Sequence, residues 1–141
     1  MSNLENSIKV AVVGASGVVG RALVEHLMLS EIPVVGLSRR PPADLADAAF
    51  QPLDLNSQTE CEQMAESTLS DATHLVYAAL FEKPGLISGW QEQDQMQTNL
   101  AMLRNLLDPL KGSGKLRHVT LLQGTKAYGA HVEPMKIPGV E

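Results

Sequence analysis

The 141-residue sequence contains a single cysteine, which limits how the fold can be stabilised. Cys61 cannot form an internal disulfide, and no histidine lies near it in the sequence to share a metal. The four histidines, His26, His74, His118 and His131, lack the spacing of metal ligands. We therefore expect no metal site, and we interpret Cys61 as a bystander thiol in a reducing cytoplasm.

The sequence also lacks an excess of positive charge and any long apolar run. Its 11 lysines and arginines face 16 acidic residues, giving a formal net charge of -5 and leaving no basic surface for nucleic acid. The apolar run after residue 7 holds Gly14 and Gly17 and is too short to span a bilayer. The N-terminus has neither the basic start nor the cleavage site of a signal peptide. We expect no nucleic-acid or membrane partner.

What the chain does contain is ordinary for one folded domain. Hydrophobic residues make up 44% of it and charged residues 19%, far from the values of disordered or membrane proteins. Short aliphatic runs, which indicate strands buried on both faces, alternate with segments whose apolar residues recur at helical spacing. The expected strands are 8–13, 33–37, 49–55, 73–80 and 117–123, and the expected helices are 18–29, 57–69 and about 91–110.

The three helices carry distinguishable signals. Ser57 and Glu60 are spaced like a capping box at the start of the second helix. The glycines of residues 112–114 end the third helix. The first helix is expected to bury Val19, Leu23, Val24, Leu27 and Met28, and the third is expected to bury Met96, Leu100, Leu103, Leu107 and Leu110.

This alternation of strands and helices predicts an α/β fold, a doubly wound parallel sheet of the Rossmann type. Right-handed crossovers then favour the strand order 3-2-1-4-5. We expect residues 1–128 to form the domain and residues 129–141, with Pro134 and Pro138, to form an irregular tail.

A glycine-rich turn lies between the first expected strand and the first expected helix. In Gly-x-x-Gly-x-x-Gly, Gly14 allows the sharp turn, Gly17 allows the backbone to approach a pyrophosphate, and Gly20 allows the helix to pack against the strand. The helix N-terminus offers unpaired N–H groups to the phosphates. A glycine-rich turn can also arise by chance, but its position predicts dinucleotide binding. The expected phosphate-binding residues are Gly14, Ser16, Gly17, Val18 and Gly20.

The end of the second expected strand predicts which dinucleotide binds. NAD sites usually have a carboxylate there, whereas this chain has Ser38, Arg39 and Arg40. Guanidinium groups at that position favour the 2′-phosphate of NADP(H), although the arginines could instead belong to a solvated loop.

Other residues are expected beside the cofactor with their alternatives open. Asp54, followed by Leu55, could accept a hydrogen bond from the adenine amine, or it could cap a helix or stabilise a turn. Asn99, a poor helix former, could order water or backbone near the site or face solvent. Trp90 could cover a pocket or pack on the helix. The small residues Ala78 and Ala79, before Leu80, let a cofactor approach the sheet.

Several motifs together resemble the extended short-chain dehydrogenase/reductases, which include the NAD-dependent epimerase/dehydratase-like proteins. They are most similar to the progesterone 5β-reductase and iridoid synthase-like enone reductases. The likeness covers nearly the whole chain. Its motifs are residues 12–20, 36–41, 73–80, 99–107, 116–119 and 124–129.

The resemblance implies NADPH-dependent hydride transfer to an enone or carbonyl of a small molecule. In that family Lys126 of Gly-Thr-Lys-x-Tyr would lie near the substrate oxygen, and Gly124 and Thr125 would lie beside the cofactor. In the family pattern Tyr128 belongs to the loop after the fifth strand, where it would pack under the cofactor. The tyrosine that acts as the principal acid in the family would come after residue 141. The chain would thus lack the second catalytic residue and the substrate pocket.

Two hypotheses follow. The chain is the NADP(H)-binding portion of an oxidoreductase with impaired activity, or it is a free-standing dinucleotide-binding or redox-sensing module that acts through a partner. With the fifth strand at the sheet edge, we expect self-association through that edge or the long helix, pairing by the tail, or instability.

Overall fold

The computed structural model describes residues 7–44, 50–84 and 92–124. All five strands are parallel and form one sheet in the order β3-β2-β1-β4-β5, so the predicted α/β fold and strand order are confirmed. The expected tail, 129–141, lies outside the described residues. The elements are β1 (Val10–Val13), α1 (Val18–Leu29), β2 (Val34–Ser38), β3 (Phe50–Pro52), α2 (Gln58–Glu66), β4 (His74–Tyr77), α4 (Gln93–Leu110) and β5 (His118–Leu121).

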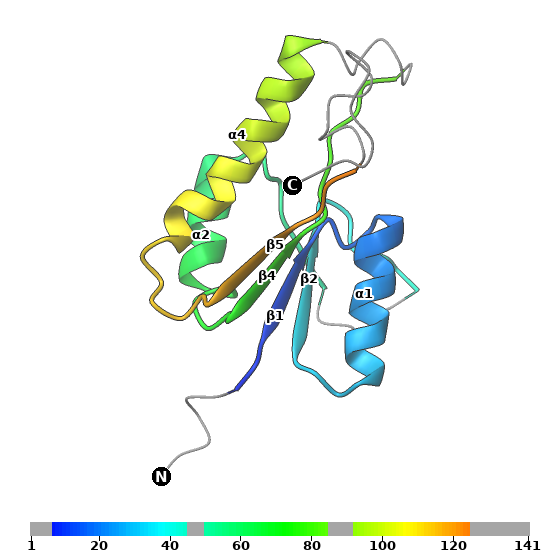
Figure 1. Ribbon diagram of the computed structural model, residues 1–141, viewed down its shortest axis with the longest axis vertical. Coiled ribbons are helices and arrows are strands. Elements are labelled where there is room, and N and C mark those ends of the chain that lie inside the picture. The colour runs from blue at the N-terminus through cyan, green and yellow to red at the C-terminus, as the bar shows by residue number, and fades with distance from the viewer. Residues whose placement is uncertain (1–6, 45–49, 85–91, 125–141) are drawn as a thin grey trace, which may run out of the picture.

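The helices lie on both faces of the sheet, with α1 on one and α2 and α4 on the other (Figure 1). The chain crosses the sheet in one direction from β1 to β2 and in the opposite direction from β3 to β5, so right-handed crossovers place the helices on opposite faces. Val12 of β1 is buried with Val24 under α1, whereas Val13 is buried with Leu106 under α2 and α4. Successive residues of β1 therefore point to opposite faces of the sheet and are buried in two separate hydrophobic cores.

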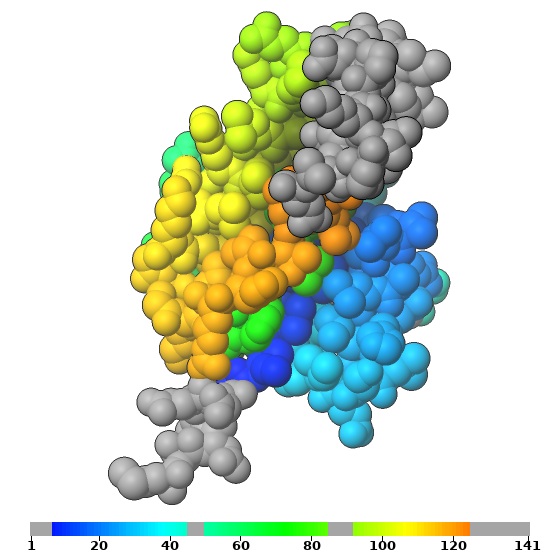
Figure 2. Space-filling model, in the orientation of Figure 1, coloured from blue at the N-terminus to red at the C-terminus, as the bar shows by residue number. Residues whose placement is uncertain are grey.

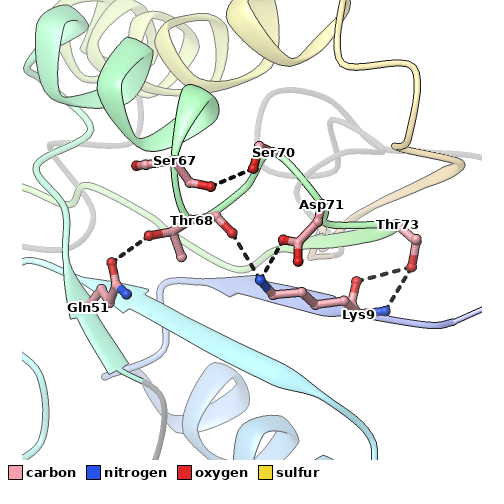
Figure 3. Close-up of polar contacts among 7 residues, drawn as sticks. All are labelled: Lys9, Gln51, Ser67, Thr68, Ser70, Asp71 and Thr73. Atoms are coloured by element: carbon pink, nitrogen blue, oxygen red, sulfur yellow. Dashed lines mark hydrogen bonds and ion pairs between the residues drawn. The ribbon is translucent and has the colours of Figure 1, made fainter. Parts of the chain in front are cut away.

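Side chains join the amino ends of β1 and β4 (Figure 3). The backbone N–H of Lys9 donates to Thr73 Oγ1 at 2.9 Å, and the same hydroxyl donates back to the Lys9 carbonyl at 3.2 Å. Lys9 Nζ forms an ion pair with Asp71 at 2.6 Å and donates to the Thr68 carbonyl. These bonds hold two adjacent strands together at the end of the sheet where both strands begin.

Helix α1 has the predicted bounds but a narrower buried face. Val24 and Leu27 are buried as expected, whereas Val19 is 57% exposed and Met28 is 38% exposed. A Cβ atom on Gly20 would lie 2.2 Å from the Gly14 carbonyl oxygen. The helix approaches the glycine turn closely at Gly20. The residues that α1 buries are therefore those in line with Gly20, namely residues 20, 24 and 27.

The predicted buried face of α4 is partly wrong. Met96 and Leu100 are 55% and 46% exposed, and Leu103 and Leu107 are only partly buried against the core. Leu110 is buried as expected. The residues that α4 buries are Gln95, Met102, Leu106 and Leu110. Up to Leu106, the buried face is thus displaced by one residue from the predicted one, because it begins at the polar Gln95 and continues through Met102 and Leu106.

The third strand and second helix are shorter than predicted. Strand β3 ends at Pro52, so Asp54 and Leu55 follow the strand and are not part of it. Ser57 caps α2 by accepting from the Glu60 N–H at 3.2 Å. The return bond of a capping box is absent, because the Glu60 carboxylate accepts from the Asp54 N–H instead.

Strand β5 lies at the edge of the sheet, and in the described ranges its only strand partner is β4. Val119, Leu121 and Leu122 are each at least 40% exposed, in a part of the chain visible on the surface in Figure 2. The expected edge strand is thus confirmed. None of the helices in the described ranges combines the length and apolarity needed to cross a bilayer.

Cys61 is fully buried on the inner side of α2, and its Sγ atom lies 3.9 Å from the Asp54 carbonyl oxygen. Burial, together with the nearby carboxylates of Glu60 and Asp54, raises the pKa of the Cys61 thiol to about 11. The thiol is therefore protonated and shielded in the folded protein.

We predict that native Cys61 reacts slowly with an aromatic disulfide reagent at pH 8 and rapidly after unfolding in urea, because the reactive species is the thiolate. Free glutathione provides the reference rate. Native labelling at the free-thiol rate would contradict the buried position.

We predict that Gly20→Ala lowers the free energy of unfolding by about 1–3 kcal/mol, the usual cost of overpacking, because its methyl group would collide with the backbone of Gly14. Urea denaturation measures this change. Gly112→Ala is the matched control, since no atom lies within 4 Å of its added Cβ. Equal effects of the two substitutions would show that the close contact is absent.

Candidate functional site

A cavity of about 560 Å³ opens at the carboxyl ends of the strands. Segments that follow β1, β2, β3 and β4 line it, and Met102 of α4 contributes one side chain. This is where parallel α/β sheets bind ligands. The predicted cofactor residues in its lining are Gly14, Ser16, Gly17, Val18, Ser38, Arg39, Asp54, Leu55, Ala78, Ala79 and Leu80.

The turn after β1 has the backbone geometry predicted from its glycines. Gly14 has a φ of +85°, in the left-handed region that favours glycine. Its N–H donates to the Leu37 carbonyl at 2.9 Å, which joins the turn to β2. A Cβ atom on Gly14 would lie 2.6 Å from the Ala79 nitrogen. The turn therefore packs directly against the backbone that follows β4.

The start of α1 presents unused hydrogen-bond donors at the cavity. The N–H groups of Ser16 and Val18, two residues of the cavity lining, donate to no backbone acceptor within the described ranges. Gly17, the N-cap, has no side chain to cap the helix, and the first turn contains no acidic residue. Anions bind favourably at such a helix end because of its free N–H groups and its dipole.

The two candidate arginines, adjacent in the segment after β2, differ in their access to the cavity. Arg39 lines the cavity, whereas Arg40 lies outside the lining. The Ser38 hydroxyl donates to the Arg40 carbonyl at 3.1 Å, so its proton already has an acceptor. Arg39 is therefore the cation best placed to meet a ligand in this part of the site.

The segment after β3 is a turn stabilised by Asp54. Its Oδ1 atom accepts from the Asn56 N–H at 2.9 Å, so the structure shows the turn role that the sequence left open. The carboxamide of Asn105, on α4, donates to the Leu55 carbonyl at 2.9 Å. One wall of the cavity is thereby attached to α4.

The segment after β4 is attached to α4 by side-chain amides. Asn99 accepts from the Phe81 N–H and donates to the Phe81 carbonyl, both at 2.8 Å. Gln95 accepts from the Lys83 N–H at 2.9 Å. The alternative that Asn99 orders backbone near the site is thus confirmed, and the alternative that it merely faces solvent is wrong.

An ion pair reinforces this attachment. Lys83 Nζ bonds to Glu92 at 2.5 Å and also to Asp94. The hydrogen bond from Lys83 lowers the pKa of the Asp94 carboxyl and raises the pKa of Lys83. The ion pair is formed by Lys83, two residues after Phe81. It therefore helps to hold Phe81 where this residue lines the cavity.

Some predicted site residues lie elsewhere. Gly20, Arg40, Asn99 and Gly124 are outside the cavity lining, and Trp90, Thr125, Lys126 and Tyr128 lie outside the described residues. Seven lining residues were not predicted as site residues: Val13, Leu37, Leu53, Asn56, Phe81, Glu82 and Met102. All but Met102 lie within two positions of a predicted site residue, so extending each predicted segment by one or two positions would have found them. No group of three or more potential metal ligands occurs in the described part of the chain.

Comparison with known proteins gives relatives over most of the chain. It is 31% identical over 144 residues to (S)-8-oxocitronellyl enol synthase of Catharanthus roseus, covering 92% of this chain and 34% of that protein. It is 34% identical over 125 residues to 3-oxo-Delta(4,5)-steroid 5-beta-reductase of Arabidopsis thaliana, covering 83% and 31%. The chain spans about a third of the length of these curated relatives. The resemblance inferred from the motifs is confirmed.

Solved structures share the fold. The Bordetella bronchiseptica enzyme WbmG, in complex with NAD and UDP, has a TM-score of 0.71 at 16% identity, covering 94% of this chain and 43% of that one. UDP-glucose 4-epimerase of Thermus thermophilus, in complex with NAD, has a TM-score of 0.64 at 21% identity, covering 77% and 35%. Residues 10–141 match the family described as NAD dependent epimerase/dehydratase. With its parallel sheet and glycine turn, the chain belongs to the NAD dependent epimerase/dehydratase family.

Proposed function

We propose that the chain binds NADP(H) in the cavity at the carboxyl ends of its strands and forms the cofactor-binding part of an oxidoreductase. The observation that carries the proposal is the glycine turn, which leaves the free N–H groups of α1 facing the same cavity as Arg39. Such a combination suits a ligand with a diphosphate and a further phosphate.

The cavity fits a dinucleotide in its size and its chemistry. A volume of about 560 Å³ lies within the range of small-molecule sites. Ala78 and Ala79 present only small side chains opposite the glycine turn. When bound, NADPH would supply a hydride, while these residues would bind and orient it against the sheet.

The preference for NADP over NAD rests on the segment after β2. Arg39 is exposed, and no hydrogen bond or ion pair joins its guanidinium to another residue in the described ranges. Asp54, the nearest predicted site carboxylate along the chain, already accepts hydrogen bonds from Asn56. A 2′-phosphate would therefore meet an available guanidinium, with which it can form charge-assisted hydrogen bonds.

The substrate class comes from the relatives. Their names describe an enol synthase and a steroid 5-beta-reductase, so we propose hydride transfer to an enone or carbonyl of a small molecule in the complete enzyme. The role of Lys126 and the impaired activity of this chain stay predictions from the resemblance. Its cytoplasmic location and its self-association stay predictions from the lone cysteine and from the edge strand or long helix. NADPH oxidation with small enones tests activity directly, and turnover by the chain alone would contradict impairment.

We predict that calorimetry gives a lower Kd for NADP than for NAD. One or two hydrogen bonds to a charged group correspond to roughly tenfold or more in affinity. Equal affinities would overturn the NADP preference, and absence of binding to either would overturn the assignment of the cavity.

The positions of the two arginines predict unequal effects. Arg39→Ala should weaken NADP about tenfold or more, while Arg40→Ala should weaken it less, because only Arg39 lines the cavity. Both variants should leave the Kd for NAD nearly unchanged. A larger loss in Arg40→Ala would reverse the assignment of the cation.

Removal of the Asn99 side chain should lower both stability and affinity. In Asn99→Ala the N–H and carbonyl of Phe81 lose their partners, at a cost of about 1–3 kcal/mol in the free energy of unfolding. We also expect weaker cofactor binding, because Phe81 lines the cavity. Gln97→Ala, on the exposed side of the same helix, is the matched control. The two variants should differ in both urea denaturation and calorimetry.

A further inference from the structure

A bidentate ion pair joins α1 to the segment that carries the two arginines. Arg21 Nη2 lies 2.7 Å from Asp44 Oδ2, and its Nη1 lies 3.4 Å from Oδ1. Arg21 Nε also bonds to Glu25, one turn further along the helix, at 3.1 Å. The hydrogen bond from Arg21 lowers the pKa of the Asp44 carboxyl. Asp44 is therefore ionised and paired at neutral pH.

The segment has few other attachments. Residues 39–44 follow β2 directly and are mostly exposed. In the described part of the chain, their only other hydrogen bond is the one from the Ser38 hydroxyl to the Arg40 carbonyl. That bond holds the segment where it leaves the sheet. The pair with Arg21 holds it at Asp44, beyond the arginines and two prolines.

We propose that Arg21 and Asp44 form a latch that positions the arginine segment for the 2′-phosphate of NADP, making Arg21 a positioning residue for cofactor choice. The inference rests on the proposed function, because it assumes that the cavity binds NADP. Anchoring at both ends restricts the conformations of the segment, so less entropy is lost when Arg39 meets the ligand.

Charge alone predicts a different result, which makes the latch testable. Asp44 is a negative charge a few residues from the proposed phosphate site, so its removal would favour an anionic ligand by relieving Coulomb repulsion. Under the latch, the same substitution frees the segment and weakens binding. The two effects of Asp44→Asn on NADP therefore have opposite signs.

Calorimetry of the whole chain with NADP, NAD and adenosine 2′,5′-bisphosphate separates these cases. We expect Asp44→Asn to weaken NADP and the bisphosphate about two- to fivefold, the range of an exposed ion pair, and to change NAD less. Unchanged or tighter NADP binding would overturn the latch. An equal loss for NADP and NAD would overturn its role in cofactor choice.

Two controls match the substituted pair. Asp71→Asn breaks an ion pair of similar exposure at the opposite end of the sheet, with side-chain exposures of 29% and 59% against 37% and 66% for the Arg21–Asp44 pair. Glu25→Gln removes the other partner of Arg21 without touching the segment. Neither control should change the ratio of the two Kd values, and a change as large as that of Asp44→Asn would overturn the latch.

A double-substitution cycle shows whether the two residues act together. Under the latch, Arg21→Gln combined with Asp44→Asn should weaken NADP no more than the more damaging single change. Additive losses would overturn it. If the unsubstituted chain does not prefer NADP, the proposed NADP preference on which the inference rests fails. If it does prefer NADP and Asp44→Asn leaves the preference intact, only the latch fails.

Discussion

The contact on which the site depends is between backbones. At Gly14 the chain turns sharply out of β1, and its carbonyl lies against Gly20 of α1 while its Cα faces the peptide between Ala78 and Ala79. A side chain at Gly14 or Gly20 would collide with these backbones. The absence of two Cβ atoms thus brings the start of α1 and the segments after β1 and β4 to one side of the same cavity.

Helix α4 holds two of the segments that line the cavity, the one after β3 and the one after β4. Asn99 and Gln95 bond to the backbone after β4, and Asn105 bonds to the carbonyl of Leu55 after β3. Each carboxamide satisfies a polar backbone group in a segment that has no strand partner to do so. Polar residues on the inner side of α4 therefore position the loops, while Met102 and Leu106 supply apolar contact.

Local signals allowed much of the fold to be predicted. The bounds of α1 and the turn at Gly14 follow from aliphatic runs and glycine spacing, which act over a few residues. The strand order follows from the alternation of strands and helices together with the handedness of the crossovers. The buried face of α4 could not be predicted in this way, because Gln95 and Asn99 turn inward only to meet a backbone distant in sequence. The same holds for Arg39 and Arg40, which are adjacent in sequence but differ in access to the cavity.

The short strands explain why loop anchoring matters here. Each described strand has three to five residues, so most of the cavity lining comes from segments beyond the strands, which bond to the sheet backbone only where they leave it. Such segments can change sequence without disturbing the core, but the sheet holds only their first residues in place. Their order must come from the helices: α4 attaches the segments after β3 and β4, and Arg21 of α1 attaches the segment after β2. Cofactor choice in this fold would then depend on the residues that meet the ligand and equally on helix side chains that never touch it.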